Sequence, residues 1–200
     1  MRRKTLDTLL TATGAVIALV LLAAGGLLTW ASSYVADQVS DQLAMQDITM
    51  PAEDALETDA QHEALDQYAG QPMTTGDQAK AFADHYILVH MNAASDGRTY
   101  EEVSGEFMQL SADPKADAEE VAALGQLRQT LFMGNTLRGL LLNAYAFDTM
   151  GEIAGYAAIA SFGGAAALLV LTALGVVHMR RTPSDTEVGA ARRDTVATGI

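Results

Sequence analysis

Two long apolar runs lie near the ends of the chain, with a mixed polar stretch between them. The first, residues 9–30, has no ionisable side chain over about 22 residues, the length that a membrane helix needs. The second, residues 151–178, follows a leucine-rich stretch without an intervening proline or turn cluster. We therefore predict two membrane-spanning helices, the second continuous with a helix that begins at about Asn135.

The first helix is expected to continue beyond the membrane. Val35, Val39 and Leu43 recur every four residues with polar positions between them, which predicts a helix to about Gln46. A cleaved signal peptide is the alternative interpretation of the amino-terminal run, because basic residues precede it. The run is longer than the apolar core of a usual signal peptide, which favours the membrane span.

Between the two runs, helix-start patterns recur and no alternating strand pattern is present. A capping box, in which a threonine and a glutamine or glutamate three residues later satisfy each other's backbone groups, predicts three helix starts. The first of these helices is expected to end at Gly70 and the second at about Asn92, and a fourth to run from Asp113-Pro114 to Gly134. The predicted fold is all-α. The three capping boxes are Thr58 with Gln61, Thr75 with Gln78, and Thr99 with Glu102.

Charge is distributed unevenly along the chain, whose formal net charge is -13. Residues 31–150 carry 20 acidic side chains against five basic ones, and the other seven basic residues lie in the segments 1–8 and 179–200. Basic residues concentrate in cytoplasmic segments of membrane proteins. This pattern predicts a plasma-membrane protein with a basic cytoplasmic tail at 1–8, an extracytoplasmic helical domain at 31–150 and a disordered cytoplasmic tail at 179–200.

The same acidity limits the partners that the central domain can bind. A strongly negative domain repels nucleic acid, so we expect no nucleic-acid ligand. The chain has no cysteine, which excludes disulfides and thiolate metal sites. The expected partners are the lipid bilayer and either another membrane or envelope protein or a second copy of the chain.

Small residues recur along both apolar runs. Such residues let membrane helices approach closely, so they predict that the two spans pack into a hairpin, although the same stripes could serve a homodimer or a larger complex. The first run offers Gly14, Ala18 and Gly25, and the second offers Ala157, Ser161, Gly164, Ala165, Thr172 and Gly175.

Candidate catalytic groups are few. His85 and His90 are five residues apart, which on an α-helix places them about 140° from each other rather than on one face, and His62 lies in a separate acidic segment. The acidic segment from Glu53 to Asp66 lacks the ligand spacing of a calcium-binding loop. We expect no metal site and no cofactor.

Asp148 and Glu152 are four residues apart, at the point where the last helix is expected to enter the membrane. Like charges at this spacing repel each other mildly, and Arg138 lies too far along the helix to neutralise them. They either mark the boundary with water or form a cation or proton site, or a contact for a basic partner. The candidate interaction or switch residues are therefore Arg138, Asp148 and Glu152.

Three segments carry a resemblance to a known group of proteins. They are Asp41-Gln42-Leu43, the run from Tyr68 to Ala79, and the run from Leu137 to Phe147. Together they resemble a family of small two-span membrane proteins of high-GC Gram-positive bacteria, many of which are labelled as subunits of an aromatic ring-opening dioxygenase. The resemblance implies the two-span topology. A dioxygenase of this type would hold a non-haem iron with histidines and a carboxylate.

These observations favour a non-enzymatic membrane protein, an accessory or scaffold subunit that presents its acidic domain to another envelope protein or membrane complex. Two alternatives stay open. One is a metal-dependent enzyme of the ring-opening dioxygenase type, and the other is a sensor of cations or pH.

Overall fold

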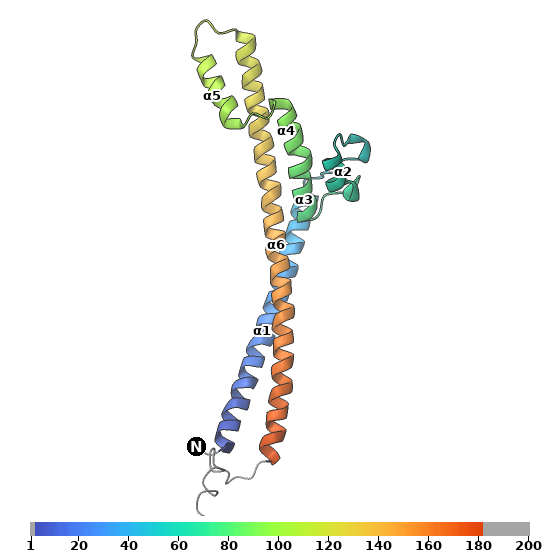
Figure 1. The fold of residues 1–200 in the computed structure, drawn as a ribbon, viewed down its shortest axis with the longest axis vertical. Helices are drawn as coiled ribbons and strands as arrows, with labels where there is room; N and C mark the ends of the chain where they lie inside the picture. Colours follow the sequence, from blue (N-terminus) through green and yellow to red (C-terminus); the bar gives the residue numbers. More distant parts are fainter. Residues whose placement is uncertain (1–2, 182–200) are drawn as a thin grey trace, which may run out of the picture. The chain divides into compact units, whose positions relative to one another are not determined.

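The computed structural model describes residues 3–181, and this part of the chain is helical apart from its connections and one isolated bridge between Thr49 and Pro72 (Figure 1). The all-α prediction is therefore confirmed for the described residues. Residues 1–2 and the predicted cytoplasmic tail beyond Arg181 lie outside the described residues. The α-helices are α1 (Arg3–Ala44), α2 (Asp59–Leu65), α3 (Gly76–Phe82), α4 (Leu88–Ser95), α5 (Tyr100–Ser111) and α6 (Ala118–Arg181).

Three short helical segments of other kinds complete the described fold. Two are 3-10 turns, η1 (Glu53–Ala55) and η2 (Asp66–Tyr68). The third, η3 (Ala83–Ile87), is a π-helical turn that joins α3 to α4. The helix predicted from Thr75 to about Asn92 is thus present with a wider turn in its middle, and it ends at Ser95.

The described residues form two compact units, one made of residues 3–32 with 153–181 and the other of residues 33–152. We call them the apolar unit and the acidic unit. Parts of α1 and α6 belong to each.

In the apolar unit, α1 and α6 pack through small residues. A Cβ on Gly25 would lie 2.9 Å from the ring of Phe162, and a Cβ on Gly175 would lie 2.6 Å from Oγ1 of Thr11. Neither position has room for a larger side chain, so the glycines set how closely the helices approach. Of the other predicted packing residues, Ala18 and Ala165 are fully buried, Gly14 and Gly164 face Thr172 and Leu21, and Ala157 and Ser161 are half-buried.

Many large apolar side chains, most of them aliphatic, are exposed on the apolar unit. Both α1 and α6 are long and apolar enough to cross a membrane, and within the most apolar stretch of each helix 11% and 6% of the residues are buried. A core helix of a soluble protein is mostly buried, so these two helices do not match that class.

In the acidic unit, one hydrophobic cluster forms where the carboxy-terminal part of α1 meets α6. Val39 and Leu43 of α1 pack with Leu141 of α6, which is fully buried. Side chains from the loops and from α2 and α3 close this cluster, which therefore joins segments far apart in the chain. They are Met50, Leu56, Leu65, Met73, Ala79 and Ala83.

A second cluster lies where α4 and α5 pack on the first part of α6 (Figure 1). It is built from Met91, Val103 and Leu131, with Leu124 and Leu127 packed against it. Val103 of α5 and Leu131 of α6 are almost completely buried at the centre of this cluster.

All three predicted capping boxes are present. In the first, Thr58 Oγ1 accepts from the N–H of Gln61 at 3.2 Å, and Gln61 Oε1 accepts from the N–H of Thr58 at 3.0 Å. The boxes at Thr75 and Thr99 have the same reciprocal bonds. These local patterns therefore start α2, α3 and α5 at the predicted residues.

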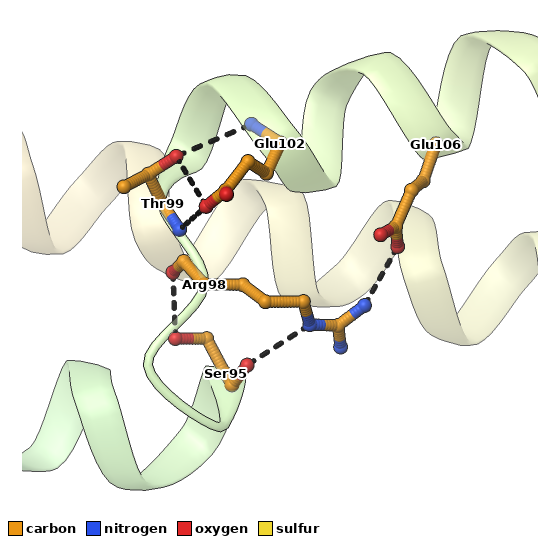
Figure 2. Close-up of polar contacts among 5 residues, drawn as sticks. All are labelled: Ser95, Arg98, Thr99, Glu102 and Glu106. Carbon is orange, nitrogen blue, oxygen red and sulfur yellow. Dashed lines mark hydrogen bonds and ion pairs between the residues drawn. The ribbon is translucent and has the colours of Figure 1, made fainter.

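Figure 2 shows the turn between α4 and α5, which is closed by its own polar groups. Ser95 Oγ donates to the carbonyl of Arg98 at 2.7 Å, and Arg98 Nε donates to the carbonyl of Ser95 at 3.0 Å. Arg98 also pairs with Glu106 at 2.6 Å. Hydrogen bonds from Thr99 lower the pKa of Glu102, the other half of the capping box.

The prediction that Gly134 ends one helix and Asn135 begins the next is wrong. α6 runs without a break from Ala118 to Arg181. A Cβ on Gly134 would lie 2.8 Å from Cγ of Met91 and closer still to its sulfur. The glycine is needed for the close approach of α4 rather than for a helix end, and the surrounding helix tolerates its low propensity.

The predicted helix start at Asp113-Pro114 is also wrong by a few residues. Asp113 Oδ1 accepts from the N–H of Lys115 at 2.9 Å, which forms a turn instead of a first helical turn. Asp117 Oδ1 accepts from the N–H of Glu119 at 2.9 Å, and α6 begins at the next residue, Ala118. Two aspartates compete for the same start, and the second caps the helix.

Candidate functional site

Asp148 contacts the beginning of another helix. Its Oδ2 accepts a hydrogen bond at 2.8 Å from the backbone N–H of Gly76, the first residue of α3. That N–H has no partner within α3, and the positive end of the helix dipole favours a carboxylate there. Asp148 is therefore a tertiary cap for α3, whereas Glu152, one turn further on, is exposed.

The close approach of the two helices requires the glycine at position 76. A Cβ there would lie 2.6 Å from Cβ of Asp148 and 2.9 Å from Cα of Tyr145. Any side chain would push α3 away from α6 and lengthen the hydrogen bond to Asp148.

Arg138 lies on the same side of α6 and contacts the following segment of the chain. Its Nη2 is 2.9 Å from Oδ1 of Asp84, and its Nε donates to the carbonyl of Ala83 at 2.9 Å. Lys80 Nζ reaches the other oxygen of Asp84 at 3.2 Å. Arg138 thus neutralises Asp84 and not the Asp148–Glu152 pair. We call Lys80, Asp84, Arg138, Asp148 and Gly76 the polar seam.

The protonation of Asp84 is set by opposing effects. Partial burial raises the pKa of its carboxyl, but the hydrogen bonds and charges of Arg138 and Lys80 together outweigh burial and hold this pKa below its ordinary value. Asp84 is therefore a stable anion at neutral pH, and its two oxygens are each occupied by a cation. The polar seam fastens α3 and η3 to α6.

The histidines do not assemble with one another. His62 Nδ1 lies 2.9 Å from Oδ1 of Asp66, and His90 Nδ1 lies 2.7 Å from the carbonyl of Tyr86. His85 lies in the π-helical turn, which separates it from His90. Across residues 3–181, no three histidine, aspartate or glutamate side chains come close enough to hold a metal ion.

Two open grooves run along one side of α6 in the acidic unit. The first, of about 490 Å³, lies between Met133 and Leu137 of α6 and the rings of Phe82, Tyr86 and His90. These rings form a ladder, with centroid separations of 5.0 Å and 4.3 Å.

The second groove, of about 370 Å³, lies further along α6 beside α1. One wall carries Leu140, Asn143 and Phe147 of α6, and the other carries the amides of α1. Leu137 and Leu140 are one turn apart, so the two grooves follow the same face of α6. The α1 wall includes these amides together with apolar side chains; its residues are Tyr34, Val35, Gln38, Val39, Gln42, Leu43 and Gln46.

In the apolar unit, the structure brings together two ionisable groups that sequence reasoning did not pair. Asp7 Oδ2 of α1 and His178 Nε2 of α6 are 4.0 Å apart, beside an open apolar groove. Asp7 lies just before the first apolar run and His178 at the end of the second, so only the pairing of α1 with α6 reveals their proximity.

No family model, curated protein or solved structure matches the chain. The fold itself defines a class, an all-helical protein with two helices long and apolar enough to cross a membrane. The resemblance to the two-span family therefore stays a prediction.

Proposed function

We propose that this protein is a non-enzymatic subunit of the plasma membrane, anchored by two spans, which presents an acidic extracytoplasmic helical unit to another envelope protein or membrane complex. The observation that carries the proposal is the exposed aliphatic surface of the apolar unit. Each exposed large side chain costs about 1.5–3 kcal/mol relative to burial, and lipid removes that cost. Its largest contributors include Leu9, Leu10, Leu19, Leu27, Ile159 and Leu171.

The distribution of charge supports the orientation of the proposed anchor. Basic residues cluster before the first apolar run and after the second, and the acidic unit lies between them. The two ends of the chain would then lie in the cytoplasm and residues 33–152 outside.

The chemistry of the acidic unit supports a binding role. In the polar seam, the carboxylates of Asp84 and Asp148 are held by Arg138, Lys80 and the α3 amide. Groups fixed in this way position helices.

Reporter fusions test the orientation. A reporter inserted after Asp96 and one fused after Ile200 should report opposite sides of the membrane. Asp96 and Gly97, on either side of the insertion point, are exposed in the turn between α4 and α5. Reporters on the same side would overturn the two-span anchor.

Crosslinking in native membranes tests the binding role. A photoreactive residue at an exposed position of the acidic unit, such as Glu101, should capture a reproducible neighbour that mass spectrometry identifies. The matched control carries the same probe at Leu171 in the apolar unit, which should capture lipid or a membrane helix instead. A protein that captures no neighbour from any exposed position of the acidic unit would contradict the proposal.

A further inference from the structure

The exposed face of α6 in the acidic unit has the spacing of a coiled-coil interface. This face is separate from the polar seam, and we call it the heptad seam, or in this subsection simply the seam. Met133, Leu140 and Phe147 recur every seven residues, and Thr136, Asn143 and Met150 recur every seven residues three positions later. This is the alternation of a and d positions in a heptad repeat. All six side chains are exposed, and the four large apolar ones are between 51% and 62% accessible.

The charge of this region is as informative as its spacing. Residues 33–152, all of which the structure describes, carry 21 acidic side chains. The two grooves beside the seam are lined without any aspartate, glutamate, lysine or arginine. A basic partner would dock on the acidic surface, whereas a partner with the same negative charge can approach closely only at an uncharged face.

A second copy of the chain is the partner that meets these conditions. Its charge is the same, and it brings an identical heptad seam. Two copies inserted in one membrane in the same sense are parallel, so each a or d residue meets its own equivalent across a two-fold axis. The amides of Gln38, Gln42 and Gln46 would flank the seam, and an amide both donates and accepts, so it pairs with its own copy.

We infer that residues 133–150 of α6 form a parallel two-stranded coiled coil with the same residues of a second copy, so that the protein is a homodimer. Thr136 and Asn143 are the two polar residues of the seam, and the amide of Asn143 can pair with that of its own copy only when the two helices are in register. The parallel orientation rests on the proposed membrane placement.

The absence of cysteine makes the test direct, because every disulfide then comes from an introduced residue. Leu140→Cys and Asn143→Cys place a thiol on the seam. Asn135→Cys and Ala146→Cys place one at exposed positions about 100° round the helix from Thr136 and Phe147. In the full chain in native membranes, mild oxidation should give a covalent dimer from the seam variants, roughly tenfold more than from the controls.

A charge-pair experiment tests the same interface without a crosslink. Leu140→Glu and Leu140→Lys each place like charges opposite one another and should give monomers in mild detergent, where the wild type is a dimer. Leu140 is 60% accessible, so both variants should fold, which helix content checks. Mixing the two variants should restore a dimer that contains one of each.

The outcomes separate this inference from the proposed function. A monomeric wild type, equal crosslinking at all four positions, or failure of the mixed variants to pair would overturn the homodimer. Capture of a different polypeptide by the seam cysteines would overturn it too, and would leave the proposed scaffold role in place. If the reporter fusions after Asp96 and Ile200 reported the same side of the membrane, the proposed membrane placement would be overturned, but the heptad contact between two copies would not.

Discussion

The carboxylate of Asp148 accepts a hydrogen bond from the backbone N–H of Gly76, 72 residues earlier in the chain. Thr75, the N-cap of α3, accepts from Gln78 instead. Two of the amides that α3 leaves unpaired at its start are thus satisfied, one by its own neighbour and one by α6. The start of α3 is therefore fixed both locally and by a tertiary contact.

Replacing Asp148 should destabilise the docking of α3. Asp148→Ala removes the acceptor and should lower the free energy of unfolding by about 0.5–2 kcal/mol, the range for lost helix caps. Asp148→Asn keeps an acceptor oxygen without the charge, so its loss should be smaller. Hydrogen exchange of the α3 amides measures the local effect, and denaturant unfolding in detergent measures the global one.

Glu152→Gln is the matched control, because Glu152 is exposed one turn further along the same helix. It should change stability by less than about 0.5 kcal/mol, as surface substitutions usually do. Equal effects at the two positions would contradict the capping role of Asp148.

Glycines of α6 should respond in opposite ways to alanine. Gly134→Ala forces a Cβ into the side chain of Met91 and should cost about 1–3 kcal/mol through overpacking. At Gly139 no atom lies within 4 Å of an added Cβ, so Gly139→Ala should stabilise the helix by up to about 1 kcal/mol. Thermal unfolding followed by circular dichroism compares the two, and a stabilised Gly134→Ala would refute the close contact with α4.

The stability of the polar seam should depend on pH through Asp84. Because the folded-state pKa of Asp84 is lowered from its ordinary value of 3.8, its contribution is present above that value and is lost as the pH falls through the folded pKa. The difference in unfolding free energy between wild type and Asp84→Asn should therefore be largest near neutral pH and shrink below about pH 4. Unfolding curves measured from about pH 7 down to about pH 3 test this.

Arg138→Met supplies a second arm of this test. Without the guanidinium, Asp84 loses its nearest cation, so the variant should be less stable than the wild type near neutral pH. On acidification, its free energy of unfolding should fall by less than that of the wild type. In Asp41→Asn, which changes an exposed carboxyl of α1, the pH dependence should follow that of the wild type. If the difference in unfolding free energy between the wild type and Asp84→Asn stayed constant with pH, the electrostatic role of Asp84 would be refuted.

Trp30 provides an optical test of membrane placement, because it is the single tryptophan of the chain and its side chain is 66% accessible. If α1 crosses the bilayer as proposed, the indole lies at the lipid–water interface, where tryptophan is favoured. Its fluorescence should be quenched more strongly by spin labels near the headgroups than by labels at the bilayer centre. Equal quenching by the labels near the headgroups and by the labels at the bilayer centre would contradict this position.

Local patterns in the sequence were sufficient to predict where α2, α3 and α5 begin. A capping box involves residues three positions apart, so it is visible without knowledge of the fold. The ion pair of Arg138 with Asp84 joins positions 54 residues apart, and no spacing rule indicates it. Lys80 of α3 and Asp84 of η3 are only four residues apart, but this spacing alone does not indicate that Asp84 also contacts α6.

Gly134 shows why the remaining errors occurred. A glycine after a helical stretch is the usual sign of a helix end, and the sequence contains no information on what lies beside it. Here the neighbour is Met91 of α4. Close packing and helix termination both require a glycine, and only the three-dimensional contact distinguishes them.

The π-helical turn η3 joins α3 to α4, and α4 keeps Met91 directed at Gly134 of α6. It accommodates one residue more than a regular α-helical turn, and its first carbonyl, that of Ala83, accepts both from Leu88 and from Arg138. Deleting one residue between Ala83 and Ile87 would restore a regular helix and leave the buried face of α4 in place, because the wider turn takes up the extra residue. Met91 would then stay beside Gly134, so natural relatives that lack this turn should still carry a small residue at position 134.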